Sequence, residues 1–204
     1  MNVYAINTGD VKKMDMDQLT RLMPRRMEKA ARYRFENDRL LGIGVGYLLM
    51  THLGIKDETL IKENEYGKPY ADGYPDFSLS HSGDIAVFSM SDEVDGSIVG
   101  VDIEIIKDFD MRVSKKVYTP REINWMNIDP KKRFFELWTK KESVMKALGM
   151  GFHLPASSFE VITQDDAQSI TVEGRRLYLR TKEYDGYYIS LCSSKKMEEI
   201  QIIT

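Results

Sequence analysis

The segment from Ile98 to Ile106 is rich in β-branched residues and carries two acidic residues near its centre. Side chains of a β-strand alternate between its faces, so Asp102 and Glu104 lie on one face and the apolar residues between them on the other. The apolar face must be the buried one, which holds the two carboxylates a few ångströms apart on the opposite face. A hard divalent cation offsets their repulsion, since Mg²⁺ takes carboxylate oxygens and keeps positions open for water and phosphate. Taken alone, the pattern is explained more simply by a half-buried strand with two solvated acids.

A long helix is predicted between Asp129 and Gly149. Asp129 suits the N-cap, and Pro130 suits the first helical turn because its missing N–H has no partner there. At the other end, Gly149 and Gly151 favour termination. At the ordinary rise per residue this helix is a rod of roughly 28 Å.

Glu142 and Lys146 are four residues apart on this predicted helix and are therefore neighbours. Glu142 also falls four residues after Trp138 and three before Met145, which places a carboxylate within or beside the apolar stripe. Glutamate is rarely fully buried unless it is paired or bound to metal. A surface Glu–Lys pair is the plainer interpretation, and the position of Glu142 on the apolar side weighs against it.

The remaining patterns divide the chain into helices and strands. Helices are expected over Asp15–Phe35, with an interruption at Pro24, and from an N-cap at Asn37 or Asp38 to about Leu53. The other predicted strands are Val3–Ile6, Phe77–Ser80, Ile85–Met90, Phe159–Ile162, Ile170–Val172, Leu177–Leu179 and Tyr188–Leu191. This order predicts an α+β fold of two similar halves, residues 1–97 and 98–204.

A histidine flanked by serines lies in the segment Phe77–Gly83, at a predicted strand end and turn. Ser80 and His81 offer several hydrogen-bond donors to an anion. Their adjacency suggests a hydrolase, but neighbouring strand residues point to opposite faces, and a Ser–His catalytic pair needs contact and an orienting acid. We therefore expect no covalent intermediate on Ser80 or Ser82. A histidine with a purely structural role is the alternative.

Charge is distributed unevenly along the chain. The formal net charge of −3 argues against a general nucleic-acid binder, which would be basic over a whole face. Between Thr20 and Leu40, however, seven basic residues, including Arg26 and Lys29, outnumber three acidic ones. This excess is suited to an anionic ligand, although a solvated helix face explains it as well.

The 204 residues suffice for one sizeable core or for two small halves packed together. A single cysteine, Cys192, rules out an internal disulfide and a cysteine-based metal cluster. No apolar run reaches the length of a membrane span, and the N-terminus lacks a signal-peptide pattern. We expect a cytoplasmic protein that does not bind a membrane.

Four motifs occur in a fixed order, and together they are more specific than any one of them. They are EYGKP at Glu65–Pro69, FSLSHSG at Phe77–Gly83, VGVDIE at Val99–Glu104 and F-x-x-x-W-x-x-K-E-S-x-x-K at Phe134–Lys146. This series closely resembles the motifs of the Sfp-type 4′-phosphopantetheinyl transferases. The basic region from Pro24 to Arg39 is similar to the N-terminal part of that family.

The resemblance implies a pseudo-dimer of two α+β halves with the active site in the cleft between them. It implies that Asp102, Glu104 and Glu142 bind Mg²⁺ together with the pyrophosphate of coenzyme A, which Lys146 contacts. The other implied coenzyme A contacts are Arg26, Lys29, Ser80 and His81 around the phosphates, and Gly67 and Lys68 near the adenine.

The implied reaction transfers 4′-phosphopantetheine from coenzyme A to a serine of an apo acyl or peptidyl carrier protein and releases 3′,5′-ADP. Glu142 is the implied general base, and a metal-bound water is the alternative. Two other functions remain open: a non-catalytic carrier-binding module and a magnesium-dependent nucleotide phosphohydrolase.

The segment Val113–Met126 lies in the region where the family contacts its partner. Its basic residues, Lys115, Lys116 and Arg121, suit an acidic carrier helix. Its aromatic residues, Tyr118 and Trp125, suit apolar anchors, unless Trp125 belongs to the core. We expect a monomer whose partners are the carrier protein and coenzyme A.

Overall fold

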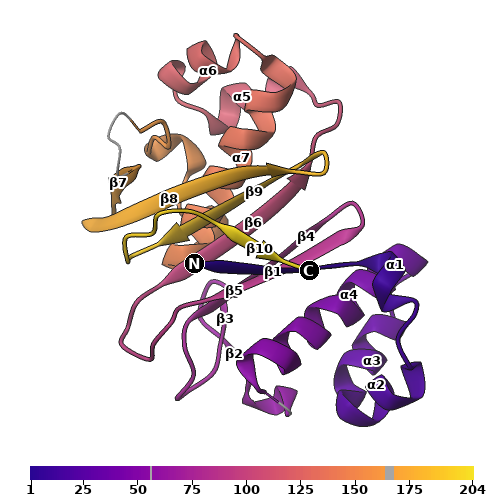
Figure 1. Ribbon diagram of the computed structural model, residues 1–204. Helices are drawn as coiled ribbons and strands as arrows, with labels where there is room; N and C mark the ends of the chain where they lie inside the picture. Colours follow the sequence, from indigo (N-terminus) through magenta and orange to yellow (C-terminus); the bar gives the residue numbers. More distant parts are fainter. Residues whose placement is uncertain (56, 164–167) are drawn as a thin grey trace.

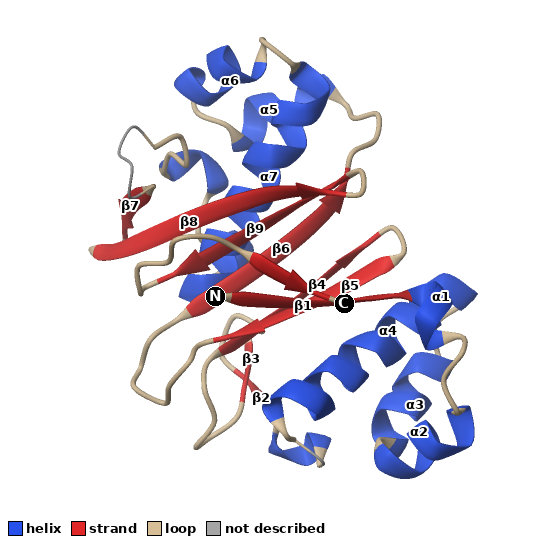
Figure 2. Cartoon of the chain, in the orientation of Figure 1, coloured by secondary structure: helices blue, strands red, loops and turns tan. Residues whose placement is uncertain are grey.

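The computed structural model describes residues 1–55, 57–163 and 168–204. Two four-stranded sheets lie at its centre, with helices on the outer side of each (Figure 1). The strand and helix layers are distinguished by colour in Figure 2. A short antiparallel pair, β2 (Lys62–Glu63) and β3 (Pro69–Tyr70), lies next to the first sheet. The fold is α+β, as predicted.

The N-terminal sheet has the strand order β10-β1-β5-β4. Its strands are β1 (Asn2–Asn7), β4 (Phe77–Ser82), β5 (Ile85–Met90) and β10 (Gln201–Ile203). β1 is parallel to β10 and antiparallel to β5, which is antiparallel to β4. Residues 201–203, assigned from the sequence to the C-terminal half, therefore belong to the sheet of the N-terminal half.

The C-terminal sheet has the strand order β6-β9-β8-β7, and all its neighbouring strands are antiparallel. Its strands are β6 (Val99–Ile105), β7 (Ser169–Val172), β8 (Arg175–Tyr184) and β9 (Tyr187–Ser193). β6 is the edge strand and carries the predicted pair of carboxylates.

Helices surround the two sheets. The α-helices are α1 (Thr8–Val11), α2 (Met16–Leu22), α3 (Pro24–Ala31), α4 (Glu36–Leu48), α5 (Met111–Val117), α6 (Pro120–Met126) and α7 (Pro130–Leu148). α4 continues as a π-helix over Leu49–Leu53, and 3₁₀ turns cover Glu58–Leu60, Gly151–His153 and Ala156–Ser158. No helix in the described parts of the chain is long and apolar enough to cross a membrane.

Several apolar clusters hold these elements together, and three of them lie against the two sheets. α4 packs through Leu41 and Leu48 on the outer face of the N-terminal sheet, and α7 packs through Leu137 and Val144 on the outer face of the C-terminal sheet. Between the two sheets lies a third core, which includes Val87, Val101 and Ile189. The two sheets consequently face each other, with one long helix behind each (Figure 1).

The boundaries of α7 match the local signals that predicted them. The Asp129 side chain accepts a hydrogen bond from the amide of Lys132, Pro130 opens the helix, and Gly149 adopts the left-handed conformation that ends it.

Two sequence predictions are wrong. α4 begins at Glu36 with Phe35 at the N-cap, because the Asn37 side chain instead donates to the carbonyl of Gly83 in the β4–β5 turn. Phe159–Ile162 is not a strand, because the amide of Val161 donates to the buried carboxylate of Glu122 rather than to another strand. The division of the chain at residue 98 into two similar halves stays a prediction.

Candidate active site

β4, an edge strand of the N-terminal sheet, lies beside β6, an edge strand of the C-terminal sheet. Three alternate serines of β4 join the two strands. The Ser78 hydroxyl accepts from the amide of Val101 at 3.0 Å, and the Ser82 hydroxyl accepts from the amide of Ile105 at 3.2 Å. Residues two apart on a strand share a face, so the period of the FSLSHS motif directs all three hydroxyls toward β6. The motif thus connects the two halves of the molecule at the position of the predicted metal site.

The same serines hold the carboxylates of β6. Ser80 donates to Oδ1 of Asp102 at 2.8 Å, and Ser82 donates to Oε2 of Glu104 at 2.7 Å. In the described parts of the chain, neither hydroxyl contacts the imidazole of His81. Both serines orient the acids of β6, and the absence of a bond to the neighbouring histidine in this part of the structure agrees with the alternation of the strand.

Helix α7 lies against β6 at Gly100. A Cβ atom at this position would fall far inside van der Waals contact with the carbonyl of Ser143 and the backbone of Ala147. This close approach brings the Lys146 ammonium to 2.6 Å from Oδ1 of Asp102 and to 2.9 Å from the Ser80 hydroxyl. Only glycine permits it, so the second residue of the VGVDIE motif serves helix packing.

A cavity of about 470 Å³ opens between the two halves at this point. Its lining residues come from α4, β4, β6 and α7: Val45, Leu79, Ser80, His81, Asp102, Glu104, Trp138, Glu142 and Lys146. It therefore unites six of the predicted site residues from three separate motifs. Of the others, Trp138 was assigned only to the apolar stripe of the helix, and Val45 and Leu79 carry no sequence signal beyond hydrophobicity.

The cavity disfavours the charged form of its three acids and so raises the pKa of each. Burial and the nearby Asp102 raise the pKa of Glu142 to about 7. Burial also raises the pKa of Asp102 and of Glu104, against the opposing effect of their hydrogen bonds. For His81, partial burial and the charge of Lys146 lower the pKa. The site is therefore short of positive charge.

One oxygen at this site is exceptional. Oδ2 of Asp102 is buried and has no hydrogen-bond partner among residues 1–55, 57–163 and 168–204. Buried carboxylate oxygens normally have a partner, and Mg²⁺ prefers oxygen ligands of this kind. Among the described residues, no three Asp, Glu, His or Cys side chains are close enough together to hold a metal ion in their present conformations. The chemistry of the donors nevertheless fits a hard divalent cation.

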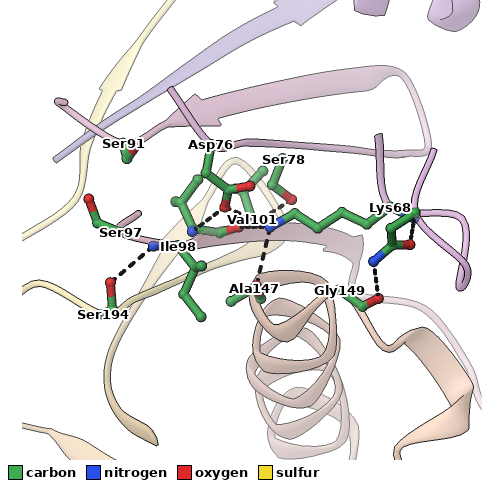
Figure 3. Close-up of polar contacts among 12 residues, drawn as sticks. Lys68, Asp76, Ser78, Ser91, Ser97, Ile98, Val101, Ala147, Gly149 and Ser194 are labelled. Carbon is green, nitrogen blue, oxygen red and sulfur yellow. Dashed lines mark hydrogen bonds and ion pairs between the residues drawn. The ribbon is translucent and has the colours of Figure 1, made fainter. Parts of the chain in front are cut away.

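Gly67 and Lys68 line a second cavity of about 290 Å³, which shares Leu79 and Lys146 with the first. Figure 3 shows that the Lys68 ammonium points toward Asp76 and the backbone of β6 and α7. The loop is therefore adjacent to the site, but its one cation is already engaged.

Arg26 and Lys29 are not among the lining residues of either cavity. Nε of Arg26 donates to Glu58 at 2.7 Å, and its side chain packs over Gly46 of α4. Lys29 is exposed on α3. The structure does not bring this part of the basic segment to the carboxylates.

The predicted partner segment folds as α5 and α6. Lys115 and Lys116 are exposed, whereas Arg121 forms an ion pair with Glu160 at 3.0 Å. Tyr118 is 3% exposed and donates to the carbonyl of Phe134, so it belongs to the core and is not available as an anchor. Trp125 is half-buried beneath the guanidinium of Arg133.

Carboxylates beside a lysine and a histidine, in a cavity between two α+β layers, define a site suited to a divalent cation and a phosphate ester. A family model described as the 4′-phosphopantetheinyl transferase superfamily matches residues 98–192. The match includes β6 and α7, which carry the acids and Lys146.

Curated relatives extend the likeness over the whole chain. The 4′-phosphopantetheinyl transferase Sfp of Bacillus subtilis (strain 168) is 30% identical over 213 residues, which cover 95% of this chain and 92% of that protein. The 4′-phosphopantetheinyl transferase gsp of Aneurinibacillus migulanus is 32% identical over 155 residues, covering 72% of this chain but only 63% of that protein. The psf-1 transferase of Bacillus pumilus is 29% identical over 227 residues, 100% of this chain and 95% of that protein. The chain belongs to the 4′-phosphopantetheinyl transferase superfamily.

Proposed function

We propose that this protein transfers the 4′-phosphopantetheine group of coenzyme A to a serine of an apo acyl or peptidyl carrier protein and releases 3′,5′-ADP. The observation that carries the proposal is the cavity between the halves, where Asp102, Glu104 and Glu142 lie with Lys146 and His81. Membership of the superfamily and the names of the relatives support the same activity.

In this proposal Asp102, Glu104 and Glu142 hold Mg²⁺. Two observations fit that role, because both indicate a site that favours a cation: Oδ2 of Asp102 lacks a partner among the described residues, and the pKa of all three acids is raised. Mg²⁺ bound there would neutralise charge on the pyrophosphate of coenzyme A.

Lys146 is the proposed contact of the pyrophosphate, and the position of its ammonium on the same cavity as the acids supports this role. Ser80 holds Asp102 in place, and His81 offers its imidazole to a phosphate at the cavity rim. Gly67 and Lys68 border the adjoining cavity, where the adenine is proposed to bind. Arg26 and Lys29 would reach the 3′-phosphate only from α3, outside both cavities.

The reaction forms a bond between the carrier serine oxygen and the β-phosphorus and breaks the bond from that phosphorus to the oxygen of the leaving 3′,5′-ADP. The proton of the serine hydroxyl must leave at the same time. Glu142 is the proposed acceptor, since its carboxylate lies on the cavity beside Lys146 and the other acids. Transfer is proposed to be direct, without an intermediate on Ser80 or Ser82, whose hydroxyls hold the acids of β6.

One experiment tests the function. The protein is incubated with coenzyme A and Mg²⁺, with and without an apo carrier protein, and the carrier and the nucleotides are analysed by mass spectrometry. A phosphopantetheine adduct on the carrier together with 3′,5′-ADP is the expected result. Consumption of coenzyme A without a carrier would indicate a phosphohydrolase, and carrier binding without consumption would indicate a non-catalytic module.

A further inference from the structure

The Asn64–Lys68 loop caps the C-terminal end of α7. The last carbonyls of an α-helix have no partner within the helix and must find one elsewhere. Here the Asn64 side-chain amide donates to the carbonyl of Gly149 at 2.8 Å, and the Lys68 ammonium donates to that of Ala147 at 3.2 Å. Both bonds reach from the N-terminal half of the sequence to the helix that carries Glu142 and Lys146.

Asn64 also organises the loop itself. Its side-chain oxygen accepts from the amides of Tyr66 and Lys68, at 3.0 and 2.8 Å. The loop thus has a defined conformation that presents Lys68 to the helix end.

The Lys68 ammonium is fully engaged. It donates to Oδ2 of Asp76 at 2.6 Å and to the carbonyls of Val99 and Ala147 at 3.2 Å each (Figure 3). An ammonium group has three protons, so these acceptors use all of them. The side chain is only 13% exposed, and a phosphate would have to displace one of these partners to contact it.

Asp76 completes the arrangement on the strand side. Its Oδ2 also accepts from the amide of Val99 at 2.7 Å, so the ion pair binds both backbone groups of that residue. Val99 lies three residues before Asp102 in β6, and Ala147 follows Lys146 in α7. The pair therefore joins the strand of the metal-binding acids to the helix of Glu142 and Lys146.

We propose that Lys68 and Asp76 are positioning residues for the transfer reaction, which set α7 against β6 so that Glu142 and Lys146 stay in place opposite Asp102. The inference rests on the proposed function for its consequence in catalysis. Loss of one partner leaves the other charge buried and unpaired, so either substitution shifts the same contact between strand and helix.

The test uses Lys68→Met and Asp76→Asn in the full chain. A displacement near 1 Å at a reacting group costs about 10²-fold in rate. We therefore expect each variant to lose about that factor in kcat, with a smaller rise in the KM for coenzyme A because Lys146 is displaced as well. Lys62→Met on β2 is the matched control, since Lys62 forms an exposed ion pair with Asp72, and it should behave as wild type.

The combined variant Lys68→Met/Asp76→Leu protects the test against a folding defect, because apolar pairs often replace buried ion pairs without loss of stability. Its kcat should fall no further than that of the single variants, because all three variants remove the same interaction, the ion pair between Lys68 and Asp76. If Lys68→Met instead raises the KM for coenzyme A at unchanged kcat, and Asp76→Asn is silent, Lys68 binds substrate directly and the proposal is overturned.

A second measurement does not depend on activity. Amide hydrogen exchange at the last turn of α7 should be faster in Lys68→Met than in wild type or Lys62→Met. Unchanged protection overturns the positioning role. If wild type transfers no phosphopantetheine while exchange responds as expected, the proposed function fails and the connection between loop and helix stands.

Discussion

At the scale of single residues, the site is defined by three acids in a cavity that is short of positive charge. Asp102 has one oxygen shared between Ser80 and Lys146 and the other without a partner in the described parts of the chain. Glu142 faces it from α7, and the charge of each acid disfavours ionisation of the other. Such a cluster is costly to stability, and cation binding is the function that we propose for it.

Replacing one of these acids should abolish transfer. Asp102→Ala and Glu142→Ala should each retain less than about a tenth of wild-type turnover, because a lost metal ligand costs more than the 1.4 kcal/mol of one tenfold step. Turnover is measured with an apo carrier at saturating coenzyme A, and circular dichroism checks the fold. Glu136→Ala is the control, since Glu136 pairs with Lys140 on the same helix outside the cavity. Turnover above that level in either cavity variant would contradict the three-carboxylate site.

The pKa of Glu142 predicts how stability depends on pH and Mg²⁺. Because burial raises this pKa from 4.5 to about 7, the folded protein without metal holds a proton that the unfolded chain releases, and stability falls as the pH rises through this range. Mg²⁺ binds the deprotonated carboxylate. The rise in Tm on adding MgCl₂ should therefore be smaller at pH 6 than at pH 8.

Differential scanning calorimetry across this pH range measures the effect. Glu142→Gln, which cannot titrate at this position, should show a smaller rise in Tm with less dependence on pH. A rise in wild-type Tm that is the same at both pH values would count against Glu142 as a ligand.

At the scale of elements, the contact between β6 and α7 determines the geometry of the site. The strand and helix backbones touch at Gly100, and the acids of β6 lie on that same face of the strand. The buried ion pair of Lys141 and Glu122 joins α7 to α6 on its other side, with the Lys141 ammonium also donating to two carbonyls of the following segment. α7 is thus fixed from both sides.

Gly100→Ala should separate β6 from α7. The added methyl group meets backbone atoms, which cannot rotate away, so we expect a loss of about 3 kcal/mol or more in the free energy of unfolding. Urea denaturation measures this loss, and transfer activity should fall with it. Gly42→Ala in α4 is the control, because its new methyl group meets the ring of half-exposed Tyr33 and alanine favours the helix. Equal stability of the two variants would disprove the packing role of Gly100.

At the scale of the whole molecule, the two halves depend on each other. The shared core between the sheets, the serines of β4 and the parallel pairing of β10 with β1 all join segments far apart in the sequence. Coenzyme A is proposed to contact both halves, whereas the exposed lysines of α5 lie on the C-terminal half alone (Figure 1). Binding of the two substrates should therefore be separable by mutation.

Charge reversal on α5 tests this separation. Lys115→Glu/Lys116→Glu should raise the KM for an acidic carrier protein several-fold and weaken its dependence on salt, with the KM for coenzyme A unchanged. Steady-state kinetics at two ionic strengths measure both constants. Lys182→Glu/Lys196→Glu, at two exposed lysines outside α5, is the matched control for total charge. An equal effect from the two pairs would assign the loss to net charge alone and not to a carrier surface.

Much of this structure follows from local sequence signals. The ends of α7 depend on Asp129, Pro130 and Gly149, and the faces of β6 follow from alternation of its residues. Turns, helix caps and the alternation of apolar and polar residues in strands depend on a few neighbouring residues, so the sequence alone predicts them. The α+β class and the acids of the site were predicted on these grounds and from the order of the four motifs.

The tertiary structure decided what depends on residues far apart in the chain. The sequence does not show that Lys68 would turn to Asp76 and the end of α7, or that Arg26 would pair with Glu58. Nor does it show that residues 201–203 would join the first strand. An ammonium group binds whichever acceptors packing brings near, and a short strand pairs with whichever edge is free. Such choices are made by the three-dimensional arrangement, and they determine which of the charged residues in the motifs face the cavity and which hold its walls.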